Sequence, residues 1–292
     1  MKILKKLLTN PLSLTGILLV LMFTVVALAA PIIAPPEDPR DPYQIPRDGF
    51  LAEPKPPNPE HPFGTTEGQY DIFYGVVWGT RTAFRVGLIV TGATLLIGLT
   101  VGTIAAYYGG WVDELLMRIV EIFMAFPFLL ATITAAAVLQ PKIGKSIVVG
   151  MIALVIFGWT GYARLIRGDI LSIKEREYVL AARTVGARDF RIITRHILPN
   201  AIFPTLVVAS MDIGSYVLTF AALSFLGIGA DVGYADWGQL ISFARNWIPA
   251  LATYWYILVY PGMAILLFVL GWNLIGDAFR DILDPRLRGV RG

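Results

Sequence analysis

Cysteine is absent from this chain, and histidine occurs only twice in its 292 residues. The lack of cysteine excludes disulfide bonds, thiolate metal sites and cysteine nucleophiles. The two histidines, His61 and His196, lie far apart and have no histidine or glutamate partner at metal-ligand spacing. We therefore expect no metal site in this chain.

Charged residues are also scarce. They make up 15% of the chain, whereas hydrophobic residues make up 56% and the mean hydropathy is +0.65. A soluble domain of this length needs more charged surface, because apolar surface in water promotes association. The net charge of +3 is too small for the basic patch that binds nucleic acid. The composition indicates a protein surrounded by membrane lipid, with no nucleic-acid partner.

The apolar residues are gathered into long blocks. A helix that crosses about 30 Å of hydrocarbon needs about 20 apolar residues. Blocks of about this length run over Leu12–Ala34, Val86–Gly110, Ile122–Gln140, Ser146–Ala163, Ala201–Gly229 and Ile248–Gly276. The first also resembles a signal peptide, but it continues through Pro31 to Ala34, which favours a retained span. We predict an all-α, polytopic protein of the cell (inner) membrane with about six transmembrane helices.

Glycine and proline add detail to these blocks. Gly92, Gly98 and Gly102 lie in the second block, where small residues allow neighbouring helices to pack closely. Pro127 and Pro261 lie inside the third and sixth blocks, and proline bends a transmembrane helix. We expect close packing along the second span and bends in the third and sixth.

The distribution of basic residues orients the chain. Three lysines precede Pro11, eight basic residues lie in the loop 164–200, and four arginines follow Gly276. All three segments are predicted to be cytoplasmic, which agrees with six spans. The chain then divides into a cytoplasmic N-terminus with the first span (1–34), an external Pro-rich loop (35–85), a five-helix core (86–276) containing the cytoplasmic loop 164–200, and a cytoplasmic tail (277–292).

The external loop is acidic and rich in proline. Residues 35–80 contain eight acidic residues, three basic residues and ten prolines, which disfavours helix and favours extended chain. Two interpretations stay open: a solvated linker, and a cap or docking surface for an external partner. Asp71–Arg85 has apolar residues at helical spacing, which is consistent with a helix lying along the outer membrane interface.

The cytoplasmic loop is predicted to contain two short amphipathic helices. Apolar residues recur at helical spacing on both sides of Gly186, which can adopt a positive φ and turn the chain. Pro199 is expected to end the second helix, and Asn200 is expected to cap the fifth span. One interpretation is an element that lies on anionic lipid through its arginines. The other is a docking element, in which the small Ala181 and Ala182 allow close approach by a partner.

The same stretch resembles a loop of permeases from binding-protein-dependent ABC importers. The pattern of that loop is Glu-Ala-Ala, three residues, Gly, nine residues and Ile-x-Leu-Pro. The matching residues are Ala181, Ala182, Gly186, Leu198 and Pro199, whereas Leu180 replaces the motif's glutamate and His196 its isoleucine. Glu177 lies one turn before Leu180 and is expected to substitute for that glutamate. Residues 61–65, 106–113, 223–229 and 284–288 are similar to the dipeptide, oligopeptide and nickel branch of this family.

The resemblance implies a type I ABC importer transmembrane domain. A paralogous permease would form a heterodimer with this chain, two cytoplasmic ATP-binding subunits would bind ATP and Mg²⁺, and an external solute-binding protein would deliver the substrate. This chain would be a non-catalytic subunit that binds no cofactor itself. The residues implied in coupling to the ATPase are Glu177, Ala181, Ala182, Arg183, Gly186, Arg188, Leu198 and Pro199.

The chain shows no ATP site or catalytic residue of its own. Gly144-Lys145-Ser146 ends like a phosphate-binding loop, but Leu139 stands where the first glycine of that loop is required. No nucleophile and base pair stands out either. The alternative function is an ATP-independent secondary transporter, a class marked by inverted repeats and several intramembrane acids. Neither is clearly visible in this sequence.

Two residues of the fifth block are predicted to line the translocation pathway. Asp212 is a charge well inside a span, which is costly unless it faces water or a partner; a structural contact between helices is the alternative. Phe220 stands where many peptide permeases of this branch have glutamate. This difference weakens the resemblance to peptide permeases, but peptides remain the first expectation for the substrate, ahead of oligosaccharides and other solutes.

Overall fold

The computed structural model describes residues 10–283, so the N-terminal lysines and the arginines beyond residue 283 lie outside the described part. Within residues 10–283 the secondary structure is helical, with three isolated β-bridges and no strand. Five helices are long and apolar enough to cross a membrane, and the number is six when a bent pair of shorter helices is counted as one span. The predicted all-α membrane fold with about six spans is confirmed.

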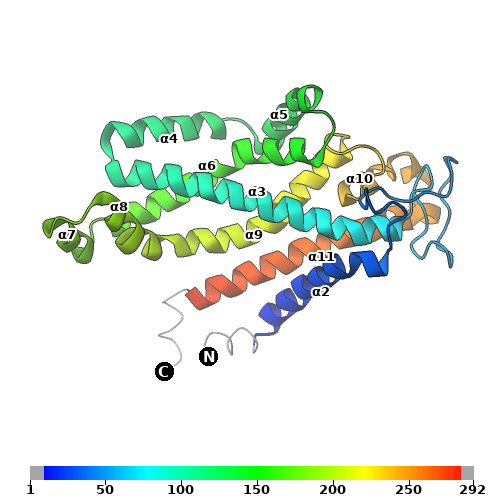
Figure 1. Cartoon of the computed structure of the whole chain (residues 1–292), viewed down its shortest axis with the longest axis horizontal. Helices are drawn as coiled ribbons and strands as arrows, with labels where there is room; N and C mark the ends of the chain where they lie inside the picture. Colours follow the sequence, from blue (N-terminus) through cyan, green and yellow to red (C-terminus); the bar gives the residue numbers. More distant parts are fainter. Residues whose placement is uncertain (1–9, 284–292) are drawn as a thin grey trace.

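The helices form an elongated bundle (Figure 1). In chain order the elements are α2 (Pro11–Ile33), α3 (Ile72–Tyr108), α4 (Gly110–Met124), α5 (Phe128–Ile143), α6 (Ile147–Ile173), α7 (Glu177–Thr184), α8 (Asp189–Ile192), the π-helical turn η1 (Ile193–Ile197), α9 (Leu198–Phe225), α10 (Trp237–Ser242), the 3-10 turn η2 (Arg245–Ala250) and α11 (Leu251–Leu283). Helices α3, α6 and α9 pack against one another, α11 packs against α9, and α2 packs against α11.

The second span begins earlier than the sequence indicated. Helix α3 is continuous from Ile72, so the predicted interfacial helix over 71–85 and the span expected from Val86 are one helix. Asp71 begins it, because its side chain accepts a 2.7 Å hydrogen bond from the backbone N–H of Tyr74. The arginines in its first turns do not interrupt the helix: Arg81 donates to the carbonyl of Ala27 at 2.7 Å, and Arg85 donates to the hydroxyl of Tyr43 at 3.0 Å.

The third span is broken. Helices α4 and α5 meet at an angle of 85°, so the single unbroken helix predicted over Ile122–Gln140 is wrong. Pro127 lies at the break with a ψ of 123°, outside the helical range. Proline lacks the N–H that would continue the helix, which confirms the bend expected there. In the sixth span, the residue with non-helical angles is Tyr254 and not Pro261.

Close packing along α3 is confirmed at two of the three predicted glycines. A Cβ atom on Gly98 would overlap Tyr162, and one on Gly102 would overlap the backbone of Ala163. Both neighbours belong to α6. Gly92 faces open space instead, with no such neighbour within 4 Å. The two glycines therefore let α3 and α6 approach each other.

Residues 35–71, here called the Pro-rich cap, fold over the end of the bundle opposite to α7 and α8 (Figure 1). The backbone N–H of Ile45 donates to the carbonyl of Gly233 at 2.7 Å, and the N–H of Ala235 donates to the carbonyl of Tyr43, also at 2.7 Å. The rings of Tyr43 and Tyr234 stack with centroids 5.3 Å apart. These contacts favour the cap over the solvated linker. The cap ends at Asp71, so the loop boundary predicted at residue 85 is corrected.

Candidate functional site

The segment Glu177–Pro199, here called the coupling hairpin, folds as the sequence predicted up to its second helix. Helices α7 and α8 are separated by Gly186, which has a φ of 76°. The N–H of Gly186 donates to the carbonyl of Arg183 at 2.9 Å, and the N–H of Ala187 donates to the carbonyl of Ala182 at 3.1 Å. Glycine adopts a positive φ without steric cost, so this residue makes the reversal between the two helices.

Pro199 does not end the second helix, contrary to the prediction. One helical segment runs from Asp189 to Phe225, because η1 joins α8 directly to α9. A π-helical turn is wider than an α-helical turn, and it precedes the position where the proline ring needs room. Asn200 is not a cap, since its side-chain amide donates to the carbonyl of His196 at 2.8 Å. The coupling hairpin is therefore continuous with the fifth span.

The inner face of the coupling hairpin packs on the bundle. Val179, Ala182, Ile192 and Ile197 are buried in one cluster with residues of α3 and α6: Ala106, Tyr107, Ile166 and Ile170. Ala182 is only 8% exposed. Its small size therefore serves contact within this chain, whereas the neighbouring Ala181 is exposed and is free to meet a partner.

Polar contacts fix the same face. The hydroxyl of Tyr107 donates to Oδ1 of Asp189 at 2.7 Å. Just before the hairpin, at the end of α6, Nζ of Lys174 donates to the carbonyl of Ala106 at 3.0 Å. The guanidinium of Arg183 lies 5.3 Å from the centre of the Tyr107 ring, a cation–π distance. Arg183, predicted as a docking charge, thus also contacts its own chain.

The outer face presents both charged and apolar side chains. Glu177, Arg188 and Pro199 are exposed, and Leu198 is half-buried. Val185 is 83% exposed and Phe190 78%. The sequence pattern assigned both to the apolar faces of the two helices and therefore missed their exposure. The one feature of the sequence that could have indicated their exposure is their position close to the Gly186 turn, because a turn at the end of a bundle has little protein to pack against.

A second feature is a cavity of about 570 Å³ at the break between α4 and α5. It is lined by Phe123, Met124, Phe126, Pro127, Phe128, Phe157, Gly158, Thr160, Gly161, Asp212, Ser215, Tyr216 and Thr219. Helix α4 is held against α6 on one side by Arg167, which makes two 2.6 Å hydrogen bonds to the carboxylate of Asp113. Such bidentate pairs fix the relative position of their two elements.

Asp212 is the acidic side chain among these lining residues. Its Oδ2 atom accepts a 2.5 Å hydrogen bond from the hydroxyl of Tyr162 on α6, and it lies one turn before Tyr216, whose hydroxyl donates to the carbonyl of Gly158 at 3.2 Å. Asp212 thus makes a contact between helices, which is one of the two roles that the sequence left open, and it also lines this cavity. Its carboxyl group lies among lining side chains that are otherwise uncharged.

Phe220 is not on the cavity wall. It is buried in a cluster with Val86, Val90, Met151 and Leu154, and its ring fills the space beside Gly150 of α6. The sequence predicted Phe220 to line the pathway; within this chain its side chain is 2% exposed and packs between α3 and α6. Asp212 lies two helical turns earlier on α9, so the two residues face different surroundings.

Residues 98–289 match the protein family described as binding-protein-dependent transport system inner membrane component. The dipeptide transport system permease protein DppC of Alkalihalophilus pseudofirmus is 36% identical over 290 residues, covering 97% of this chain and 89% of the relative. The oligopeptide transport system permease protein OppC of Bacillus subtilis is 35% identical over 280 residues, covering 96% and 87%. A solved inward-facing structure of the MetNI methionine ABC transporter matches with a TM-score of 0.59 at 18% identity, covering 73% of this chain and 98% of that one.

Proposed function

Because the chain belongs to the family of binding-protein-dependent transport system inner membrane components, we propose that it forms half of the pathway of an ATP-driven importer of peptides. Its fold is the predicted type I ABC importer transmembrane domain, and it is a permease subunit of the inner membrane. The peptide substrate is supported by the relatives, which are named as dipeptide and oligopeptide permeases.

Coupling to ATP is assigned to the hairpin at the end of the bundle. One observation carries this proposal: Val185 and Phe190 are almost fully exposed on an element whose other face is buried and hydrogen-bonded. Exposed aromatic side chains on a fixed scaffold are typical anchors of protein interfaces. The ATP-binding subunit would take these side chains into an apolar groove, and Glu177 and Arg188 would pair with charges on its rim.

ATP and Mg²⁺ would then be bound by two partner subunits in the cytoplasm. A paralogous permease would complete the pathway as the second half of a heterodimer, and an external solute-binding protein would deliver the peptide to the capped end. Movement of the ATPase subunits would reach the spans through the segment that runs from Asp189 to Phe225 without a break. The N- and C-termini would lie on the ATPase side of the membrane.

The cavity beside Asp212 is the proposed path for the peptide within this chain. A peptide carries a positively charged amino terminus, and the carboxylate of Asp212 offers it an opposite charge. The aromatic side chains Phe123, Phe126 and Phe157 provide apolar contact for peptide side chains of different kinds. The paralogous subunit would close the open side of this cavity.

Reconstitution tests the proposal. This chain, its paralogue, the ATP-binding subunits and the solute-binding protein are placed in proteoliposomes, and uptake of a labelled dipeptide is measured with and without ATP inside. We expect uptake that requires ATP and the solute-binding protein together. Uptake by this chain alone, driven by an ion gradient and indifferent to ATP, would contradict the proposal and favour a secondary transporter.

A further inference from the structure

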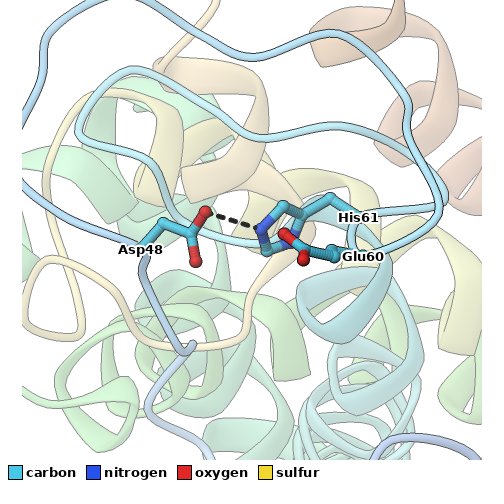
Figure 2. Close-up of side chains that lie close together, drawn as sticks. All are labelled: Asp48, Glu60 and His61. Atoms are coloured by element: carbon cyan, nitrogen blue, oxygen red, sulfur yellow. Dashed lines mark hydrogen bonds and ion pairs between the residues drawn. The ribbon is translucent and has the colours of Figure 1, made fainter.

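The Pro-rich cap brings together three side chains that can bind a metal ion: Asp48, Glu60 and His61 (Figure 2). One ligand atom from each lies within 4.8 Å of the other two, and Nε2 of His61 is 3.0 Å from Oδ2 of Asp48. The sequence gave no indication of this cluster, because Asp48 is 13 residues away from His61 and is brought to it only by the fold of the cap.

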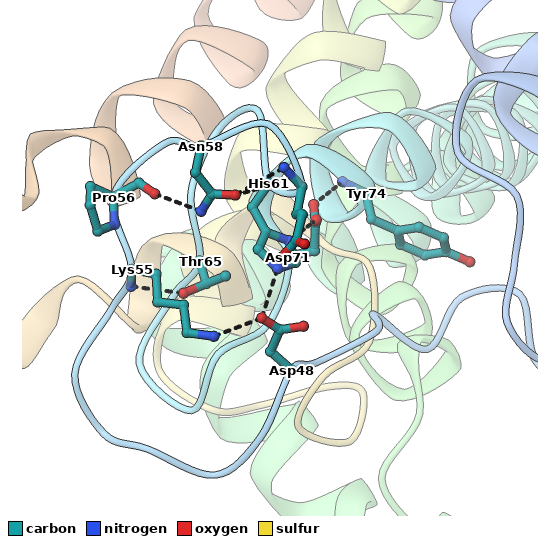
Figure 3. Close-up of polar contacts among 9 residues, drawn as sticks. Asp48, Lys55, Pro56, Asn58, His61, Thr65, Asp71 and Tyr74 are labelled. Carbon is teal, nitrogen blue, oxygen red and sulfur yellow. Dashed lines mark hydrogen bonds and ion pairs between the residues drawn. The ribbon is translucent and has the colours of Figure 1, made fainter.

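The histidine ring is held in the orientation of a metal ligand. Its Nδ1 atom lies 2.6 Å from Oδ2 of Asp71, and Oδ1 of Asp71 is itself fixed by the N–H of Tyr74 at the start of α3 (Figure 3). A carboxylate at Nδ1 sets the tautomer that leaves a lone pair on Nε2. Metal-binding histidines are commonly oriented in this way by a carboxylate outside the coordination sphere.

With that tautomer, the lone pair of Nε2 faces an oxygen of Asp48. Two acceptors at 3.0 Å need positive charge between them, which either a second proton on the ring or a metal cation supplies. The distances suit a cation, because zinc lies about 2.0–2.2 Å from nitrogen and oxygen ligands. Asp48 and Glu60 are exposed, so their side chains have room to turn toward an ion bound at Nε2 of His61.

The net charge of the cluster suits a divalent ion. Asp48, Glu60 and Asp71 are acidic, and Lys55 is the nearby base, with Nζ 2.7 Å from Oδ2 of Asp48. Three carboxylates and one ammonium leave two negative charges when His61 is neutral.

The backbone that carries two of the ligands is already ordered. Oδ1 of Asn58 accepts from the N–H of Glu60 at 2.9 Å and from the N–H of His61 at 3.0 Å, and its amide donates to the carbonyl of Pro56 at 3.1 Å (Figure 3). The side chain of His61 is only 12% exposed, whereas Asp48 and Glu60 face solvent. An ion in solution therefore reaches a fixed histidine past two exposed carboxylates.

We propose that Asp48, Glu60 and His61 bind a divalent transition-metal ion of the zinc class on the Pro-rich cap, with Asp71 as the residue that positions the histidine. A mixed nitrogen and oxygen ligand set of this kind suits zinc or nickel, whereas magnesium and calcium prefer oxygen ligands alone. The ion would tie residue 48 to the segment 60–61 and hence to the first turn of α3. This inference does not depend on the transported substrate.

Isothermal titration of the metal-stripped, full-length chain in lipid nanodiscs with Zn²⁺ tests the proposal. We expect one ion per chain for the wild type and loss of that binding in His61→Gln and in the double variant Asp48→Asn with Glu60→Gln. Asp71→Asn should weaken binding by about 10- to 100-fold, because asparagine still caps α3 but no longer supplies a carboxylate at Nδ1. Mg²⁺ added in place of Zn²⁺ should give no binding in the same range.

Matched controls are His196→Asn, which removes the other histidine, and Glu37→Gln, which removes an exposed acid elsewhere in the cap. Both should bind Zn²⁺ like the wild type. The double variant of the two exposed carboxylates guards against loss of fold, since neither side chain is buried. The proposal would be overturned if the wild type did not bind Zn²⁺, or if the double variant bound it as tightly as the wild type. Loss of Zn²⁺ binding in His196→Asn would also overturn it.

Discussion

The hydroxyl of Tyr107 donates a 2.7 Å hydrogen bond to the carboxylate of Asp189, and this bond joins the last turn of α3 to the first residue of α8. The two residues are 82 positions apart. The same tyrosine ring lies under the guanidinium of Arg183. A single side chain of the second span therefore contacts both helices of the coupling hairpin.

Tyr107→Phe should weaken coupling between ATP hydrolysis and transport. The ring stays packed, but the hydrogen bond is lost, at a cost of about 1 kcal/mol. In reconstituted vesicles we expect about fivefold less peptide transported per ATP hydrolysed, with hydrolysis itself maintained. Tyr108→Phe is the control, since Tyr108 is exposed. An unchanged ratio of transport to hydrolysis in Tyr107→Phe would argue against this role of the bond.

Phe190→Ser and Val185→Ser should release the ATP-binding subunit. Both side chains are exposed, so their replacement should change the stability of the chain by less than about 0.5 kcal/mol. Loss of an interface anchor costs about 2 kcal/mol or more in binding. Co-purification from detergent measures the effect, with Val232→Ser on the capped side as the control. Full retention of the ATP-binding subunit by the double variant would contradict docking through the hairpin tip.

Asp212→Asn should slow transport of peptides that have a free amino terminus. Asparagine still accepts the hydrogen bond from Tyr162, so the helix contact is kept while the charge is removed. We expect uptake of an unmodified dipeptide to fall about tenfold, which corresponds to about 1.4 kcal/mol, whereas uptake of its N-acetylated form should change little. Equal rates for variant and wild type at every pH tested would show that Asp212 does not face the pathway.

Asp236 should make stability depend on pH. Its burial raises the pKa of this carboxyl to about 6, although its Oδ2 atom accepts from the N–H of Gln239 at the start of α10. Since the folded-state pKa lies above the usual value of 3.8, the unfolded chain ionises first. The contribution of Asp236 to stability therefore falls as pH rises from about 4 to about 6, then stays constant.

The comparison of wild type with Asp236→Asn isolates this effect from other carboxylates. Asparagine is also a good helix cap, so the variant should keep α10 without the titration. Tyr234, the titratable neighbour of Asp236, has its pKa raised to about 12 by burial and stays neutral throughout this range. We expect the difference in melting temperature, variant minus wild type, to increase as the pH rises from about 4 to about 6. Parallel curves over that window would contradict the assignment.

The sequence predicted best what depends on local spacing. Hydrophobic blocks located five of the six spans, and Gly186 located the turn of the coupling hairpin. The early start of α3 was missed because Arg81 and Arg85 look like the edge of a span until their partners, Ala27 and Tyr43, are known. These partners come from a different helix and from the cap, and no periodicity within α3 reports them.

The candidate sites also separate into features that the sequence shows locally and features that depend on contacts between distant residues. Asp212 was singled out from its charge alone, because an acid in an apolar block is conspicuous; the structure adds its contact with Tyr162 and its place on a cavity wall. Phe220 was placed on the pathway, yet it fills space beside Gly150, and one apolar residue in a span looks like another until its neighbours are known. The Asp48 and His61 contact arises from the path of the cap, which spacing in the sequence does not encode.

The continuous helical segment from Asp189 to Phe225 connects the hairpin directly to the cavity wall. At 1.5 Å per residue its 37 residues span about 55 Å. In the proposed importer, the end held by the hairpin would face the ATP-binding subunits, and Asp212 lies about 35 Å along the segment. In the proposed importer, a displacement of the hairpin would be transmitted along this continuous helical segment toward Asp212. Helices α4 and α5 line the same cavity as this segment but are separated by a break. They would therefore not be forced to move together with it.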